Sequence, residues 1–337
     1  MSRLRLVCFA IAINFAVTCV VRAEERPDAS ELLRRFRQTM EQLTTYYIEA
    51  TCKTVDPFAN EASRTKYVVT SEEFTLVRHG GRLRFGGVRH MSTAKGDMFT
   101  MGEEHLIDDA FFPKELVGFA WNRLDPNRLF VNPLNLDGER KPESVRTMSD
   151  APFPMFGGSF SDSGQLWWMM ERATTLEVLP GMETVAEHKT YVVKSQGKDG
   201  IHTVWLDPEF GCLPRKIVVD KLPGHVWGQT QLGVKRDNTS LEELHRQFDN
   251  IKLERKQEQF LITSYDMKTE EIKLTDDRRE RLTTRTEFRV QTIELDSALW
   301  PPNAFRPAVE IPEGTLVVNR TRQPCGVWKN GKIELNP

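Results

Sequence analysis

The sequence lacks the short motifs that mark most metal, nucleotide and hydrolase sites. It contains no CxxC, CxxH or HExxH spacing and no GxSxG elbow, and its paired glycines lack the context of a phosphate-binding loop. The seven histidines are scattered along the chain at spacings that favour no metal site. These absences predict no catalytic residue, no metal site and no cofactor, which makes an enzyme the least favoured class.

Cysteine is also sparse. Cys8 and Cys19 lie within the first 23 residues, and only Cys52, Cys212 and Cys325 follow, at wide spacings. An odd number of widely spaced cysteines excludes a dense disulfide framework. The sequence leaves open whether one pair among the last three forms a bridge.

A long apolar run occurs only at the start of the chain. The basic segment "MSRLR" precedes the uncharged run "LVCFAIAINFAVTCVV", and Val21 and Ala23 put small residues three and one positions before Glu24. This is the three-part form of a secretory signal peptide, so we expect cleavage near Ala23 and an exported, periplasmic protein. A signal anchor is the alternative, for which the run is rather short.

The charge of the chain is close to balanced. Forty-six basic residues face 48 acidic ones, which gives a formal net charge of −2 at pH 7. Mixed signs and a mildly acidic balance give no electrostatic reason to bind nucleic acid, which we therefore exclude as a partner.

Apolar periodicity predicts one amphipathic helix followed by many strands. In residues 28–43 apolar side chains recur at three- and four-residue intervals, after Asp28 or Ser30 as a cap. Residues 45–109 and 175–296 are then rich in short β-like runs without long helices between them, which indicates antiparallel pairing. The predicted class is α+β, an antiparallel sheet that carries a few helices.

Turn residues divide the second β-rich block. In "TVWLDPEFGCLPRKIVV", Asp207, Pro208 and Gly211 predict a hairpin turn. The turn alone explains these residues, so no catalytic role is assigned to them. Gly197 to Gly200 predicts another. Ser240 with Glu243 fits a capping box, so a polar segment that interrupts the sheet is expected there.

Residues 111–165 are broken by proline, glycine and asparagine and read as irregular structure, which is often a lid or a binding loop. A short helix is predicted directly after them, in "GQLWWMMERA". Aromatic and methionine side chains suit a variable apolar ligand, although ordinary core packing is the alternative. The candidate lid or wall residues are Phe153, Phe156, Phe160, Trp167, Trp168, Met169 and Met170.

Four passages together resemble the LolA-like superfamily of periplasmic lipoprotein carriers, which also contains RseB-like domains. They are "ELLRRFRQTMEQLTTYYIEATCKTV", "FTLVRHGGRLRF", "TYVVKSQGKDGIHTVWLDPEFGCLPRKI" and "IELDSALWPPNAFRPAVEIPEGTLVVN". The resemblance implies a LolA-like half-open antiparallel β-barrel covered by a few helices. It suggests one domain over residues 24–337, with insertions near 111–165 and 222–258.

The resemblance also implies a function. The expected protein is a non-enzymatic, exported carrier that binds a lipid or the acyl chain of a lipoprotein in the half-barrel. Its partners would then be a lipid or an acylated protein. The alternative is an envelope sensor or interaction module resembling RseB, whose sheet contacts an envelope membrane protein.

Overall fold

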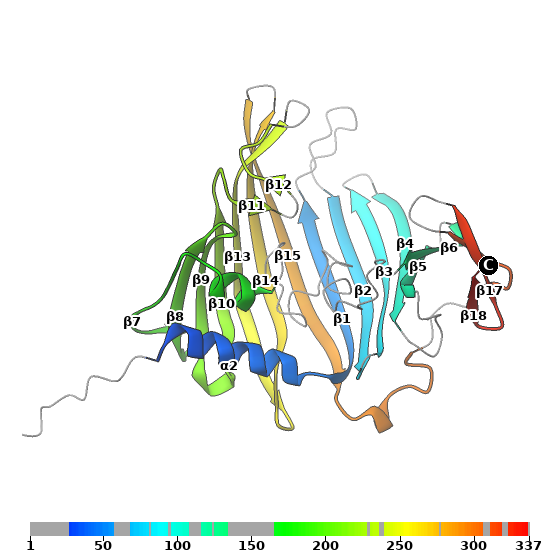
Figure 1. Ribbon diagram of the computed structural model, residues 1–337, viewed down its shortest axis with the longest axis horizontal. Coiled ribbons are helices and arrows are strands. Elements are labelled where there is room, and N and C mark those ends of the chain that lie inside the picture. Colours follow the sequence, from blue (N-terminus) through cyan, green and yellow to red (C-terminus); the bar gives the residue numbers. More distant parts are fainter. Residues whose placement is uncertain are drawn as a thin grey trace, which may run out of the picture.

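One large sheet, antiparallel except where β16 joins β6, dominates the protein and curves without closing on itself (Figure 1). The computed structural model describes residues 27–56, 68–80, 82–93, 96–107, 116–122, 125–133, 165–227, 230–235, 239–275, 278–305, 311–318 and 323–335. Within them the sheet has 16 strands, in the order β18-β17-β16-β6-β5-β4-β3-β2-β1-β15-β14-β13-β10-β9-β8-β7. Strands β11 and β12 form a separate two-stranded ribbon.

The elements have the following bounds. The strands are β1 Thr45–Asp56, β2 Val68–His79, β3 Arg82–Thr93, β4 Gly96–Ile107, β5 Leu116–Asn122, β6 Asp125–Pro133, β7 Thr175–Val185, β8 His188–Gly197, β9 Gly200–Asp207, β10 Leu213–Lys221, β11 Val226–Trp227, β12 Thr230–Gln231, β13 Thr239–Lys256, β14 Gln259–Thr275, β15 Arg278–Glu294, β16 Leu316–Val318, β17 Pro324–Lys329 and β18 Lys332–Leu335. The α-helices are α2 Ala29–Gln42 and α5 Leu166–Glu171, and the 3-10 helices are η1 Pro208–Phe210 and η2 Ser297–Leu299.

Two runs of sequential strands make up most of the sheet. Strands β1 to β6 form one meander, and β7 to β10 with β13 to β15 form the other. They join where β1 pairs antiparallel with β15, for example through Cys52 opposite Phe288. At the far end β16 pairs in parallel with β6 and carries the β17–β18 hairpin.

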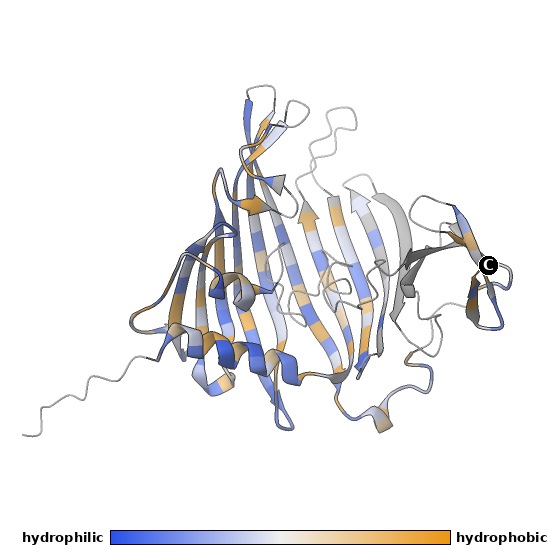
Figure 2. Ribbon diagram, viewed as in Figure 1, coloured by the Kyte–Doolittle hydropathy of each residue, from blue (hydrophilic) through white to orange (hydrophobic). Residues whose placement is uncertain are grey.

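The main core lies on one face of the sheet. Apolar and polar residues alternate along the strands, as Figure 2 shows, because neighbouring side chains point to opposite faces. Helix α2 lays its apolar side, including Leu33 and Phe36, on this core. The Phe36 ring meets the Trp167 ring of α5 edge to face, with 5.2 Å between centroids. We call this side of the sheet the helix-side face.

The chain after β15 packs on the opposite face. Arg84 of β3 is buried and donates a hydrogen bond of 3.0 Å to the carbonyl oxygen of Ala304. The Trp300 ring lies edge to face on His79 of β2, with centroids 5.8 Å apart. These contacts tie residues 295–305 to the first meander, on their way from β15 to β16.

The expected α+β class, with a curved and open antiparallel sheet under a few helices, is confirmed. The helix predicted at 28–43 is α2, and the hairpins at 197–200 and 207–211 join β8 to β9 and β9 to β10. The helix predicted in "GQLWWMMERA" is α5.

Two local predictions are wrong. Irregular structure was expected throughout 111–165, but β5 and β6 lie within that range and extend the first meander. The capping box at Ser240 and Glu243 caps no helix, since both residues belong to β13, which pairs with β10 and β14 inside the sheet. Pairing on both edges outweighs the local preference of Ser240 for a helix start.

The three cysteines after the N-terminal segment are free thiols. Cys52 and Cys212 are buried and Cys325 is half-buried, and no disulfide joins them. Burial raises the pKa of the Cys212 thiol to about 11. As for membrane crossing, no helix formed by the described residues is both long enough and apolar enough for it.

Candidate functional site: the helix-side face of the sheet

A row of apolar side chains crosses the helix-side face from β8 to β14. Cross-strand register puts each residue of the row beside the next, so that adjacent side chains can touch. The first four are fully buried and the last is partly buried. The row consists of Val193, Val204, Ile217, Phe248 and Met267.

Four aromatic rings form a ladder beside this row. Tyr265 of β14 stacks on Phe288 of β15, with centroids 5.1 Å apart and an angle of 15° between the rings. Phe248 of β13 lies 5.5 Å from Tyr265, and Phe74 of β2 lies 6.0 Å from Phe288. Such offset and edge contacts stabilise a pair beyond its buried area. We refer to these four residues as the aromatic ladder.

Strand β1 contributes small side chains where the ladder passes over it. Cys52 is opposite Phe288, and Ala50 is opposite Phe74. Because neither side chain is large, the rings of β15 and β2 approach each other across β1. Burial raises the pKa of Tyr265 far above its ordinary value, with nearby Cys52 raising it further. The ladder is thus a dry, uncharged surface.

The two helices lie mainly over one half of this face. Their principal contacts with the sheet are with β7, β8, β10 and β14. The apolar face itself continues past them onto β15, β1 and β2, through Phe288, Ile48 and Leu76. All three side chains are buried. An apolar surface therefore extends beyond the part that α2 and α5 chiefly contact.

The candidate residues of α5 divide into two groups. Trp167, Met169 and Met170 are buried in the core cluster between α2 and the sheet. Trp168 faces outward with 43% of its surface exposed, and the Arg172 guanidinium lies over its ring at 4.1 Å. Three of the four side chains thus contribute to the helix-side core.

The other candidate residues, Phe153, Phe156 and Phe160, lie outside the described residues. Sequence reasoning missed the aromatic ladder, although its residues stand in strongly alternating strands. The only signal in the sequence was an aromatic residue at an inward position of each strand, and which strands are neighbours could not be read from it.

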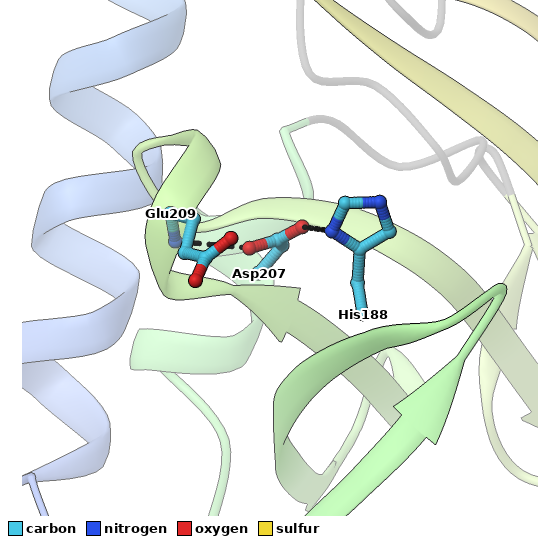
Figure 3. A group of neighbouring side chains, drawn as sticks. All are labelled: His188, Asp207 and Glu209. Carbon is cyan, nitrogen blue, oxygen red and sulfur yellow. Dashed lines mark hydrogen bonds and ion pairs between the residues drawn. The ribbon is translucent and has the colours of Figure 1, made fainter.

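Among the described residues, one group of His, Cys, Asp and Glu side chains has ligand atoms close enough together to suit a metal ion. It lies where the start of β8 meets the turn between β9 and β10. Figure 3 shows His188, Asp207 and Glu209. The His188 Nδ1 lies 3.4 Å from Asp207 Oδ2, and the Glu209 backbone N–H donates to Asp207 Oδ1 at 2.9 Å. Asp207 thereby caps η1, as its place before Pro208 predicts.

A buried arginine satisfies the same carboxylate. Both Nε and Nη2 of Arg215 lie 2.9 Å from Asp207 Oδ2, and both side chains are buried. The Arg215 guanidinium also lies 4.7 Å from the centre of the Phe210 ring. A metal ion would have to compete with this guanidinium for the same oxygen. The geometry favours a structural ion pair over a metal site, as the hairpin interpretation of the sequence expects.

Comparisons with known proteins give no family assignment. The sequence matches no family model and no curated protein. Among solved structures, the chain is similar to a LolA superfamily protein from Nitrosomonas europaea, with a TM-score of 0.34 and 8% identity over 83% of this chain and 98% of that one. It is also similar to lipovitellin, from a structure on lipid–protein interactions, with a TM-score of 0.31 and 10% identity over 76% of this chain and 26% of that one. Neither score is high enough to carry an argument about a ligand.

Proposed function

We propose that the protein binds an apolar ligand, a lipid or a protein-linked acyl chain, on the helix-side face of its sheet, and that it catalyses no reaction. The observation that carries this proposal is the continuous apolar face, which runs from Val193 on β8 to Leu76 on β2 and includes the aromatic ladder. The cluster at Asp207 is satisfied by Arg215 and so offers no support for catalysis.

Burial of hydrocarbon is sufficient to drive such binding. Each methylene removed from water contributes about 0.8 kcal/mol, so a long acyl chain can bind without polar recognition. Aromatic rings and Met267 present broad, adaptable surfaces to a flexible chain. The side chains of this face are already shielded from water, so a ligand must displace what covers them. Slow exchange is the expected kinetic signature.

The place of action is part of the proposal. The basic segment, apolar run and small residues before Glu24 support export to the periplasm, where a carrier of lipids or acylated proteins would work. Mass spectrometry of the N-terminus of the protein purified from a bacterial envelope tests this. A chain beginning near Glu24 supports export, and an intact Met1 start in the cytoplasmic fraction would contradict it.

The binding test is lipid analysis of the full chain purified without detergent, followed by titration with a fluorescent fatty acid. We expect a stoichiometric lipid or acylated peptide in the purified protein, and saturable binding after the lipid is removed. Met267→Asp puts a charge on the helix-side face and should abolish binding. Leu274→Asp is the matched control, because Leu274 lies on the same strand, is also half-buried and points to the other face.

Each outcome decides between hypotheses. Loss of binding in Met267→Asp alone supports the helix-side face as the site. Equal loss in both variants, with both folded by circular dichroism, would place binding elsewhere. A protein that arrives empty and stays empty with lipid would refute the carrier function, and would leave an interaction module as the better explanation.

A further inference from the structure

A second row of side chains crosses the helix-side face two residues along the strands from the apolar row, and it is mostly polar. Register places each residue directly beside the next on β8, β9, β10, β13, β14 and β15. The row consists of Ser195, His202, Val219, Arg246, Thr269 and Thr284. Five of these six side chains can form hydrogen bonds, whereas the apolar row has none that can.

The polar row and the apolar row are close and parallel. Each residue of the apolar row is two positions along its strand from a residue of the polar row, as Phe248 is from Arg246 and Met267 is from Thr269. Two residues of an extended strand span about 6.6–6.8 Å, so the rows are separated by little more than the width of one side chain. A ligand lying on the face would meet both rows together.

Arg246 is the permanent charge in the polar row. Its side chain is half-buried, and its Nε donates a hydrogen bond of 3.2 Å to Thr269 Oγ1. The residues two positions away on the same strand, Leu244 and Phe248, are both buried. Its positive charge also reaches Tyr265 of the aromatic ladder, where it counteracts the rise in the pKa. The cation therefore adjoins the proposed binding surface itself.

Further charged side chains lie on this part of the face. Lys221, two residues beyond Val219 on β10, is buried, and its Nζ donates a hydrogen bond of 2.7 Å to the carbonyl oxygen of Val226. Glu271 is paired with Lys273, with 2.7 Å between Oε2 and Nζ. Charged side chains therefore gather at the end of the face near Arg246, beyond the polar row.

The polar row also lies on the side away from α2. Figure 1 shows α2 across one end of the strands β8 to β14, and β11 and β12 near the opposite end. Along β10 the residues of the face run from Leu213, next to η1, through Ile217 to Val219 and Lys221. Polarity therefore increases from the end that α2 crosses toward the opposite end.

We propose that the ligand is an anionic amphiphile, whose carboxylate or phosphate end binds Arg246 and the hydroxyl of Thr269 while its hydrocarbon chain lies along the apolar row and the aromatic ladder. This inference rests on the proposed function and specifies its ligand class. A guanidinium binds carboxylate and phosphate through paired N–H donors in a planar fork. Low polarity around the pair strengthens the attraction relative to water.

The test compares a charged ligand with its neutral partner on the full chain. Radiolabelled palmitate, hexadecyl phosphate and hexadecanol share one chain length and differ at the end group. We expect both anions to bind more tightly than the alcohol by roughly tenfold or more, the range of a hydrogen bond to a charged group. Preference for one anion over the other distinguishes a fatty acid from a phosphate-bearing lipid.

Two variants with the same loss of charge identify the residue. Arg246→Met should lower the affinity for palmitate and for hexadecyl phosphate to that for hexadecanol, and circular dichroism checks that the variant is folded. Arg255→Met, on the same strand but exposed and paired with Glu258, should keep the preference. Arg246→Lys should restore part of it, because a point charge remains without the fork.

Different results refute the anion site and the proposed function. If palmitate, hexadecyl phosphate and hexadecanol bind the native protein equally, or if Arg246→Met keeps the preference, the anion site is refuted and apolar binding stands. If none of the three ligands binds, the proposed function itself is refuted and the anion site with it.

Discussion

The hydroxyl of Thr39 donates a hydrogen bond of 2.7 Å to the carbonyl oxygen of Gly211, which fastens α2 to the turn between β9 and β10. Arg35, one helical turn earlier, donates to the Pro208 carbonyl oxygen at 3.3 Å. Gly211 has a positive φ of 63° and lies directly under Thr39. The helix and the turn thus fit only because position 211 has no side chain.

Gly211→Ala should destabilise the protein strongly. A left-handed backbone costs an alanine roughly 1–2 kcal/mol, and here the new Cβ would also collide with Thr39. Gly181→Ala is the control, since Gly181 has a φ of 77° and open space around it. Urea unfolding of both variants separates backbone strain from the contact with α2. Equal losses would show that the turn and α2 are not tightly packed.

Asp207→Asn should lower the free energy of unfolding by about 3–5 kcal/mol, because it leaves the buried Arg215 without its ion partner. Arg34→Gln breaks the exposed pair with Glu31 and should leave urea unfolding unchanged. A native-like midpoint for Asp207→Asn would mean that the carboxylate is held for another purpose, for which zinc binding would be the first assay.

Phe288→Ala should destabilise the protein by about 3–5 kcal/mol, since it removes one of the two inner rings of the aromatic ladder and leaves a cavity beside Tyr265. Leu299→Ala, at a side chain that is 68% exposed, should change stability by no more than about 0.5 kcal/mol. Thermal unfolding followed by circular dichroism measures both. A mild effect at position 288 would argue that the ladder is loosely packed.

Tyr46 should make the protein sensitive to alkali. Burial raises its pKa from 10.0 to about 12, with Arg78 opposing the rise. Because the folded pKa exceeds the unfolded one, the stability that Tyr46 contributes is complete below pH 10 and is lost as the pH rises through about 12. Tyr46→Phe should flatten this decline in urea unfolding measured across that range. Parallel pH profiles for the two proteins would contradict it.

Local signals in the sequence predicted the helix and the turns. The spacing of Leu33 and Phe36 is enough to define the buried side of α2, and Asp207-Pro208 is enough to end β9. These features depend on residues within one or two turns of each other. Ser240 shows the limit, since its helix-capping pattern is overridden by strands on both sides of β13.

The candidate site could be predicted only in part. The bulky residues of α5 stood out by composition, and Trp167 does belong to the helix-side core. The aromatic ladder depends on the register between β2, β1 and β15, which pairs Ala50 with both Phe74 and Val290. Arg246 became a candidate only when register placed it among Val219 and Thr269. No pattern within one segment contains that information.

The seam between β1 and β15 has a consequence for how the chain reaches this structure. Each meander can form from neighbouring hairpins, but the seam brings together residues such as Cys52 and Phe288, which are far apart in the chain. Helix α2, directly before β1, likewise packs on the second meander. Contacts of such long range slow folding. During synthesis β1 must therefore wait with an unpaired edge until β15 has been made, and the helix-side face is completed only at that moment.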